Sequence, residues 1–110
     1  MSWFEVILET PTGRHSISCG SEEYVWDAAA RRGIELPAIC HQGRCLTCAA
    51  VLIEGEVDQT DADTYFAEDR ATGFVLICRA KPRSRLRIQT HQQHRMRQHR
   101  IARGLPAPYG

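Results

Sequence analysis

Apolar and polar side chains alternate along residues 3–10, a period typical of a β-strand with one buried face. Phe4, Val6 and Leu8 share one face of this strand, and Ile7 falls on the opposite face between two glutamates. The Pro-Thr-Gly that follows supplies turn chemistry, because proline fixes its φ and glycine permits a positive one. The pattern therefore predicts a first strand that ends in a tight turn.

After the turn, residues 15–19 can return as the second strand of a hairpin, with Cys19 as a small buried side chain. A Gly-Ser pair interrupts this strand, and its Ser21 is expected to cap a helix because two glutamates follow it. Apolar residues recur at helical spacing from Val25, and Gly33 supplies a helix end. The first third of the chain is thus predicted to fold as strand, strand, helix.

Four further segments in the second half of the chain show a readable pattern. Residues 51–57 predict a strand that bends at Gly55, and residues 63–70 are compatible with one short helix. The continuous apolar run over residues 74–78 predicts a fully buried, central strand. Residues 86–88, flanked by arginines and a glutamine, predict a last strand with one solvent-exposed face.

The composition changes beyond Thr90, where the chain becomes rich in basic residues, histidine and glutamine. Residues 91–102 are compatible with a polar helix, and the Pro/Gly-rich end is expected to be disordered. A chain of 110 residues has room for one small domain. We therefore divide it into a domain over residues 1–96 and a basic, partly disordered C-terminal extension over residues 97–110.

The net charge of +1 conceals a strong asymmetry along the chain. All thirteen acidic residues lie between Glu5 and Asp69, together with four basic residues, which gives this part a net charge of −9. From Arg70 onward there are ten basic residues and no acidic one, which gives a net charge of +10. Such an asymmetry concerns partners rather than fold. The extension is expected either to bind an acidic partner or an anionic membrane surface, or to lie against the protein's own acidic half.

Three cysteines within nine residues, Cys40, Cys45 and Cys48, are followed thirty residues later by Cys78. This Cys-x4-Cys-x2-Cys spacing with a distant fourth cysteine is the one by which plant-type proteins hold a [2Fe–2S] cluster. A tetrahedral zinc site also accepts four cysteines, but zinc sites usually combine two short Cys-x2-Cys halves. Five cysteines is an odd count, which fits four ligands plus Cys19 better than a disulfide framework. The spacing therefore favours a cluster over zinc.

The chain resembles the plant-type ferredoxins of chloroplasts and cyanobacteria over about residues 3–91. The segments that carry the resemblance are Leu36-Pro37, Thr47-Cys48-Ala49, Gly55-Glu56-Val57-Asp58-Gln59-Thr60-Asp61, Gly73-Phe74-Val75-Leu76-Ile77-Cys78 and Ile88-Gln89-Thr90-His91. The resemblance implies an α+β fold of the β-grasp ferredoxin-like type, in which a mixed sheet clasps one main helix and a loop binds the cluster.

The same resemblance implies the function. Cys40, Cys45, Cys48 and Cys78 would ligate the [2Fe–2S] cluster, and the protein would carry one electron at a time, at a potential of about −400 mV, without being an enzyme itself. Its partners would be redox proteins, with a donor such as photosystem I or a reductase. We expect a monomer in the cytoplasm, such as the cyanobacterial cytosol, because the N-terminal residues read as a strand rather than a signal and clustered cysteines suit a reducing compartment. No apolar run reaches membrane-spanning length.

The cluster loop departs from the family pattern. His41, Gln42 and Arg44 replace the usual loop residues, and Ile39 and Leu46 stand where the family usually has two hydroxyls. Losing hydroxyl donors near the sulfurs is expected to lower the potential, whereas an added arginine is expected to raise it.

The positions that plant-type ferredoxins use for docking are also changed. The family's Glu pair after the last strand is replaced by Gln93 and His94, and Thr64 stands at the position of an exposed aromatic residue, with Tyr65 and Phe66 just beyond it. These changes predict a partner set that differs from that of the acidic ferredoxins. The acidic group formed by Glu22, Glu23 and Asp27 is either a second docking face or a solvated helix surface.

Two other readings accompany the electron-carrier hypothesis. The first is a cluster-based regulatory or sensing module that acts through the basic C-terminal extension. The second is a zinc-stabilised binding domain, which would be colourless. His91, His94 and His99 are further candidate metal ligands, but their spacing matches no known site. Nucleic acid is not an expected partner, because the basic segment has no interleaved aromatic residues and no recognised binding module.

Overall fold

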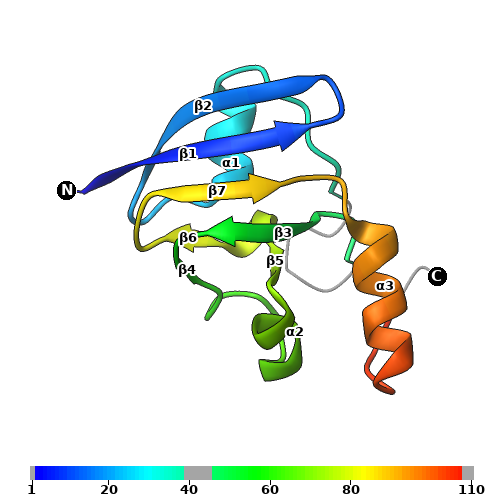
Figure 1. The fold of residues 1–110 in the computed structure, drawn as a ribbon. Helices are drawn as coiled ribbons and strands as arrows, with labels where there is room; N and C mark the ends of the chain where they lie inside the picture. Colours follow the sequence, from blue (N-terminus) through cyan, green and yellow to red (C-terminus); the bar gives the residue numbers. More distant parts are fainter. Residues whose placement is uncertain (1, 39–45, 108–110) are drawn as a thin grey trace.

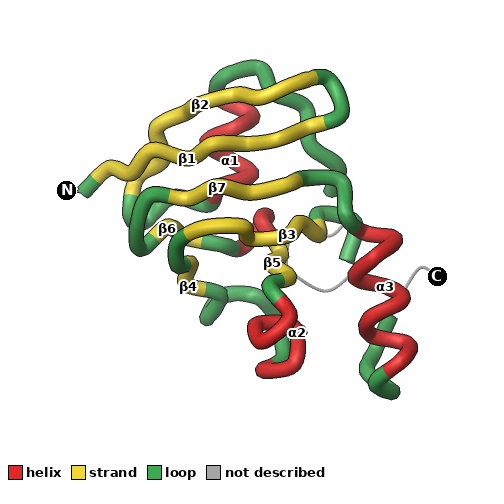
Figure 2. The backbone as a smooth tube through the Cα atoms, in the orientation of Figure 1, coloured by secondary structure: helices red, strands yellow, loops and turns green. Residues whose placement is uncertain are grey.

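The structure is a computed structural model, and it describes residues 2–38 and 46–107. These residues form, in chain order, β1 (Trp3–Thr10), β2 (Gly13–Gly20), α1 (Val25–Arg31), β3 (Ala49–Glu54), β4 (Val57–Asp58), α2 (Ala67–Thr72), β5 (Phe74–Leu76), the 3₁₀ helix η1 (Ile77–Arg79), β6 (Lys81–Pro82), β7 (Leu86–Gln89) and α3 (Gln93–Ala102). Figure 1 shows the strands as one layer with α1 behind it, and Figure 2 shows the same path by type of element.

Five of these strands form one mixed sheet in the order β2-β1-β7-β3-β5, and β4 pairs with β6 separately. β1 runs antiparallel to β2 and parallel to β7, whereas β3 runs antiparallel to both β7 and β5. The helix α1 packs against β2 and η1. This is the β-grasp arrangement that the family resemblance implies, so the predicted fold class is confirmed.

The N-terminal hairpin follows the alternating pattern of the sequence. β1 and β2 pair along their whole length, and Val6 and Leu8 are fully buried. Ile7, which the apolar–polar alternation predicted on the solvent-exposed face, is buried as well. β1 lies inside the sheet, so that its neighbours in register, Ser16 and Arg87, flank Ile7 on both sides.

The helix α1 begins later than the sequence pattern indicated. Ser21 does not cap it, because the residues after Gly20 first form a turn in which the Glu23 N–H donates to the Gly20 carbonyl at 3.0 Å. The helix starts at Val25, whose N–H donates to the Ala80 carbonyl at 2.9 Å. A backbone carbonyl from the segment between η1 and β6 thus satisfies a donor that the sequence assigned to a side-chain cap.

Residues 74–78 are buried as predicted, but they do not form a central strand. Only β5 is extended; it is the outermost strand of the sheet, and the chain then turns into η1. The side chains of Tyr65 and Gln59 cover its edge by donating hydrogen bonds to the carbonyls of Phe74 and Leu76, at 2.6 and 3.1 Å. A continuous apolar run in the sequence indicates burial only. An edge strand covered by side chains has the same apolar sequence pattern as a central strand between two neighbouring strands.

The chain bends between β3 and β4 at Gly55, as predicted. Gly55 has a φ of +103°, and a Cβ atom there would lie 2.2 Å from the Arg85 carbonyl oxygen. Both the dihedral angle and the close backbone approach require glycine. The short helix expected within residues 63–70 is present as α2, shifted towards the C-terminus.

The two oppositely charged parts of the sequence meet in the sheet. Because β7 runs beside β1, its arginines face the glutamates of that strand, and lysine and arginine around β6 face acidic residues of two loops. The ion pairs are Arg85–Glu5 (2.9 Å), Arg87–Glu9 (2.6 Å), Arg83–Asp58 (2.8 Å), Lys81–Asp61 (3.2 Å) and Lys81–Glu22 (3.3 Å). These pairs neutralise four of the ten basic residues from Arg70 onward, although each exposed pair adds little stability.

The helix α3 is held by a buried polar cluster, which includes the Asp69–Arg100 ion pair and His99. Arg100 is 0% exposed, and its Nε and Nη2 atoms lie 3.0 and 2.8 Å from the two carboxylate oxygens of Asp69. His99 Nε2 lies 3.0 Å from Asp69 Oδ1, and the Phe66 N–H donates to Asp69 Oδ2 at 2.9 Å. The guanidinium also donates to the Thr64 carbonyl at 2.8 Å. This cluster ties α3 to α2 and to the loop before it.

The predicted boundary at residue 97 falls within α3, and the residues that follow the helix lie against it. Arg97 and Arg100 donate to the carbonyls of Ala107 and Pro106, at 2.8 and 2.9 Å. Residues 106 and 107 thus fold back onto α3, while residues 108–110 lie outside the described residues. The division into a domain and an extension stays a prediction.

We expect Arg100→Met to lower the free energy of unfolding by about 3–5 kcal/mol, because it leaves the buried Asp69 carboxylate without its main partner. Arg103→Met is the matched control, because Arg103 is exposed one turn further along, and its cost should stay within about 0.5 kcal/mol. Urea unfolding followed by circular dichroism measures both. Equal costs for the two variants would contradict the role given to the buried cluster.

Candidate metal centre

Two of the predicted ligand cysteines meet in the described part of the chain. Cys48 Sγ and Cys78 Sγ lie 3.0 Å apart, and the two residues are only 2% and 4% exposed. This separation is a non-bonded one, well beyond the length of about 2.05 Å of a disulfide bond. The fold therefore brings thiols from two segments thirty residues apart to one buried point.

The two thiols are carried by short, irregular segments rather than by long elements. Cys48 directly precedes β3, and Cys78 is the middle residue of η1. The sequence pattern placed Cys78 at the end of a strand, whereas the structure turns the chain one residue earlier. The 3₁₀ turn, not a strand, presents the Cys78 thiol.

The start of β3 is fixed on both sides of Cys48. Leu46 is fully buried with a φ of +66°, and its carbonyl accepts from the Ala49 N–H at 3.0 Å, closing a turn around Cys48. The Ala49 carbonyl in turn accepts from the Gln92 N–H at 3.0 Å. The residue just before α3 is thus bonded to the residue just after this cysteine.

The chain that leads into the cysteine loop is held from α1. Trp26 Nε1 donates to the Leu36 carbonyl at 2.9 Å, and Leu36 itself is buried. Cys40 and Cys45 lie outside the described residues, as do Ile39, His41, Gln42 and Arg44. What the structure places is therefore one half of the predicted ligand set and the support of the loop's two ends.

Gln59 fixes the backbone that precedes Cys78. Its Oε1 accepts from the Leu76 N–H at 2.6 Å, and its Nε2 donates to the Leu76 carbonyl at 3.1 Å. A side-chain amide thus makes the two hydrogen bonds that a neighbouring strand would make. Gln59 belongs to one of the segments that carry the family resemblance. Neither hydrophobic periodicity nor residue spacing, however, predicts its hydrogen bonds to Leu76.

Comparison with known proteins decides the family. Residues 9–83 match the family described as 2Fe-2S iron-sulfur cluster binding domain. A protein named Ferredoxin-2 from a Synechococcus species is 42% identical over 93 residues, which cover 84% of this chain and 89% of that protein. The chain belongs to the plant-type [2Fe–2S] ferredoxins. The heterocyst ferredoxin of a Nostoc species is 42% identical over 78 residues, which cover 71% of this chain and 79% of that protein.

A solved structure of a larger protein contains the same fold. The crystal structure of Pectocin M2 matches with a TM-score of 0.76 at 30% identity, covering 84% of this chain and 34% of that one. The β-grasp fold is thus also present in an experimentally solved protein, of which this chain covers about a third. Family and relatives together confirm the predicted [2Fe–2S] cluster and the role of an electron carrier.

The residues of this ferredoxin fit such a cluster. Converging cysteine thiols are the donor set of a [2Fe–2S] centre, and the Cys48–Cys78 pair would supply two of them from the two segments of the family spacing. When bound, the cluster accepts and releases single electrons. The protein's part is to hold the thiols together and to shield them, which the burial of both cysteines does.

Cys19 is not part of this convergence. It is fully buried in β2, and its thiol donates to the Glu23 carbonyl at 3.4 Å. Burial, with a smaller contribution from the Glu23 carboxylate, raises the pKa of Cys19 to about 12. A thiol that stays protonated is a poor nucleophile and a poor metal ligand, so the prediction of a small buried residue is confirmed.

The predicted histidine site is not formed within the described residues. His99 is buried against Asp69, whereas the ring of His91 contacts the Thr90 hydroxyl through Nδ1 at 2.7 Å. His94 is exposed on α3. Among the residues that the structure describes, no group of three or more His, Cys, Asp or Glu side chains is arranged to hold a metal ion.

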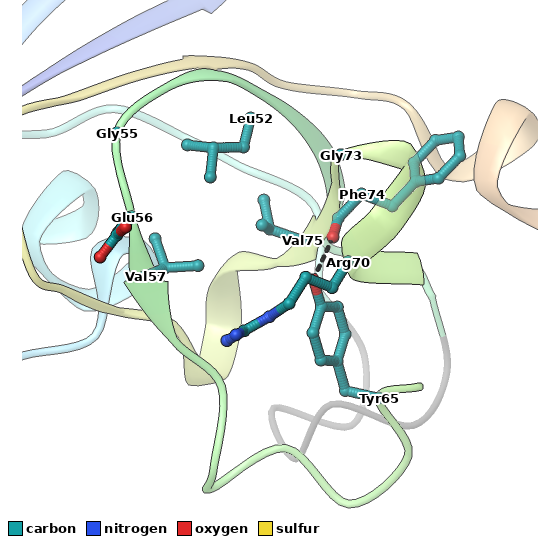
Figure 3. A pocket seen from close by; sticks show the side chains of 9 residues that line it. All are labelled: Leu52, Gly55, Glu56, Val57, Tyr65, Arg70, Gly73, Phe74 and Val75. Atoms are coloured by element: carbon teal, nitrogen blue, oxygen red, sulfur yellow. Dashed lines mark hydrogen bonds between the residues drawn. The ribbon is translucent and has the colours of Figure 1, made fainter. Parts of the chain in front are cut away.

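A cavity of about 360 Å³ opens beside β5, but it holds no thiol (Figure 3). It is lined by Leu52, Gly55, Glu56, Val57, Tyr65, Arg70, Gly73, Phe74 and Val75. Figure 3 shows Arg70 reaching across it towards Val57, with Tyr65 bonded to the Phe74 carbonyl. Burial raises the pKa of Tyr65 to about 12, so its hydroxyl stays a donor in that bond. Because no cysteine lines it, the cavity is not part of the thiol site.

The aromatic residues next to Thr64 are engaged within the protein. Tyr65 bonds to β5, and the Arg100 guanidinium lies 4.8 Å from the centre of the Phe66 ring. Both side chains are half-buried. Neither therefore presents the freely exposed ring that the family resemblance implies for this loop.

We expect Gln59→Ala to shorten the lifetime of the bound cluster several-fold, because it leaves the Leu76 N–H and carbonyl unpaired next to the Cys78 turn. Gln98→Ala, at an exposed glutamine of α3, is the control and should leave the lifetime unchanged. The decay of visible absorbance in excess chelator measures both. The same decay rate in the two variants would exclude a positioning role for Gln59.

Proposed function

We propose that Cys40, Cys45, Cys48 and Cys78 are the four cluster ligands and that the protein passes single electrons between redox proteins without catalysing a reaction itself. The observation that supports this ligand set is the convergence of Cys48 and Cys78, which are the third and fourth cysteines of the family's motif. Cys19 is left out of the set, because it lies outside the family spacing and its thiol, in β2, donates to the Glu23 carbonyl at 3.4 Å. Cys40 and Cys45 complete the set by their place in the Cys-x4-Cys-x2-Cys spacing.

The partner set of this ferredoxin differs from that of the acidic members of the family. The Glu pair is replaced by Gln93 and by exposed His94, and an exposed arginine, Arg95, follows them. Phe66 is covered by a guanidinium instead of standing free. Since opposite charges accelerate encounter and like charges slow it, a reductase with a basic docking face is a poor partner for this end of the molecule.

The acidic group at the start of α1 is partly paired within the protein. Glu23 is paired with Arg31 at 2.6 Å, and this hydrogen-bonded partner lowers the pKa of the Glu23 carboxyl. Glu22 lies 3.3 Å from Lys81 Nζ, although its side chain is largely exposed. Asp27 is also exposed, and a group that is partly paired and otherwise in water supports a solvated surface more than a dedicated docking face.

Photosystem I or a reductase remains the proposed type of donor, and the reducing cytosol remains the proposed compartment, in keeping with the cyanobacterial relatives and a buried cysteine set. Among the described helices, none has the length and apolarity needed to cross a bilayer. The comparisons give no support to the regulatory alternative.

Four single variants test the ligand set. Cys40→Ala, Cys45→Ala, Cys48→Ala and Cys78→Ala should each yield protein without the full complement of two irons and two sulfides, because the remaining three thiolates cannot close the site. Cys19→Ala is the matched control and should keep the cluster. Iron and acid-labile sulfide analysis, together with the visible spectrum, measures the outcome.

A wild-type protein that binds zinc and stays colourless would refute the cluster assignment outright. Loss of the cluster in Cys19→Ala, with retention in any of the other four, would move the ligand set instead. A one-electron reduction titration of the wild type then checks that the bound cluster cycles between two states.

A further inference from the structure

One side of α3 is exposed and carries positive charge. The residues of this outer face are His94, Arg95, Gln98 and Ile101, which recur at helical spacing, together with Arg103, which follows the helix as its C-cap; all five are exposed. Ile101 is 57% exposed and is one of the few large apolar side chains that the described chain leaves in water. The outer face therefore combines arginines with a single apolar side chain and contains no carboxylate.

The charge of the outer face is not neutralised within the protein, unlike that of β7. The arginines around β7 are paired with glutamates and aspartates. Within the described residues, Arg95 and Arg103 form no ion pair, and Arg95 Nη1 contacts only the Gln92 amide oxygen, at 3.1 Å. The basic excess of the C-terminal third is therefore concentrated on this helix.

The opposite side of α3 fixes the helix in place. Met96 and Arg100 are fully buried, and Arg100 is held by the Asp69 carboxylate and by two backbone carbonyls. A surface on such a helix is pre-organised, because few side chains and no backbone have to be ordered when a partner binds.

The N-terminal end of α3 lies next to the segment that carries Cys48. The Gln92 N–H, one residue before α3, donates to the Ala49 carbonyl, one residue after Cys48. In Figure 1, α3 runs away from the start of β3 at this point. A protein that binds the outer face and extends to the N-terminal end of the helix would thus reach the Cys48 segment.

We propose that the outer face of α3 is the docking surface for an acidic redox protein, which it holds beside the cluster site. The inference rests on the proposed electron-carrier function and adds to it the location and the charge of the partner's contact surface. The arginines accelerate association with the acidic partner by charge complementarity, and Ile101 supplies the apolar centre of the contact.

An acidic protein fits this surface better than the other polyanions do. A membrane surface is bound by a wide apolar face, whereas α3 exposes only Ile101 among its large apolar residues. Nucleic acid binding uses basic residues together with aromatic stacking, and the outer face has no aromatic side chain. Membrane and nucleic acid remain outcomes that the test separates.

The test uses the double variant R95E/R103E and the matched control R14E/R32E. All four arginines are exposed, and both variants change the net charge by the same amount, so that only the location of the charge differs. The probes are an acidic haem protein, cytochrome b5, and a basic one, cytochrome c. Stopped-flow mixing of reduced ferredoxin with each oxidised probe gives the second-order rate constant at several ionic strengths.

With cytochrome b5 at low salt, we expect R95E/R103E to lower the rate constant about tenfold and R14E/R32E to lower it about twofold or less. Added salt should slow the wild-type reaction and remove the difference between variants. With cytochrome c, R95E/R103E should react faster than the wild type. Equal rate losses in the two double variants, or no loss in either, would overturn the proposal.

Two controls separate the possible failures. Vesicles containing phosphatidylserine and a single-stranded oligonucleotide are tested for binding; if R95E/R103E loses either while its rates with cytochrome b5 are unchanged, the occupant is not a protein and the proposal is wrong. Each variant is first shown to hold the cluster and to accept one electron from dithionite. Failure at that step counts against the proposed function, whereas a normal cluster with unaltered rates counts against the docking surface alone.

Discussion

The structure depends on bringing the Cys48 thiol and the Cys78 thiol to one buried point. The two residues are thirty positions apart and lie on short, irregular segments. The sheet supplies the constraint: the first thiol directly precedes β3, β5 leads into the segment with the second, and these strands are antiparallel neighbours. A small domain has a limited core, so a cluster bound by both thiols would add a crosslink where hydrophobic burial alone is modest.

Charge is organised by the same sheet. Sequence alone reports a negative first part and a positive last part, which invites the picture of a basic tail beside an acidic body. The parallel pairing of β1 and β7 places Glu5 and Glu9 next to Arg85 and Arg87, so part of this charge separation is neutralised within the fold. On the outer face of α3, where the topology offers no acidic neighbour among the described residues, Arg95 and Arg103 keep their positive charge exposed. Partner electrostatics is therefore set by topology, not by composition.

Much of the fold was predictable because local patterns carried it: the alternation in β1, the turn at Pro11-Thr12-Gly13, the bend at Gly55 and the cysteine spacing. The errors share one physical origin. Ser21 is replaced as a cap by the Ala80 carbonyl, and β5 is covered at its edge by Tyr65 and Gln59 rather than by a strand. Each involves a contact between residues far apart in sequence, for which neither periodicity nor spacing has a signal.

The buried Asp69–Arg100 pair shows the same limit and also why the C-terminal segment matters. A mid-helix arginine in a polar, basic stretch looks like a solvated side chain, yet here its guanidinium is fully buried and binds two backbone carbonyls besides Asp69. Well-packed apolar residues are often as stable as a buried ion pair, so stability alone does not account for it. The contribution of the Asp69–Arg100 cluster is directional. The planar guanidinium must meet acceptors at fixed positions, which restricts both the rotation of α3 about its axis and its position along that axis. This restriction keeps His99 and Arg100 buried and Arg95 and Ile101 exposed, whereas a purely apolar contact would restrict the helix less.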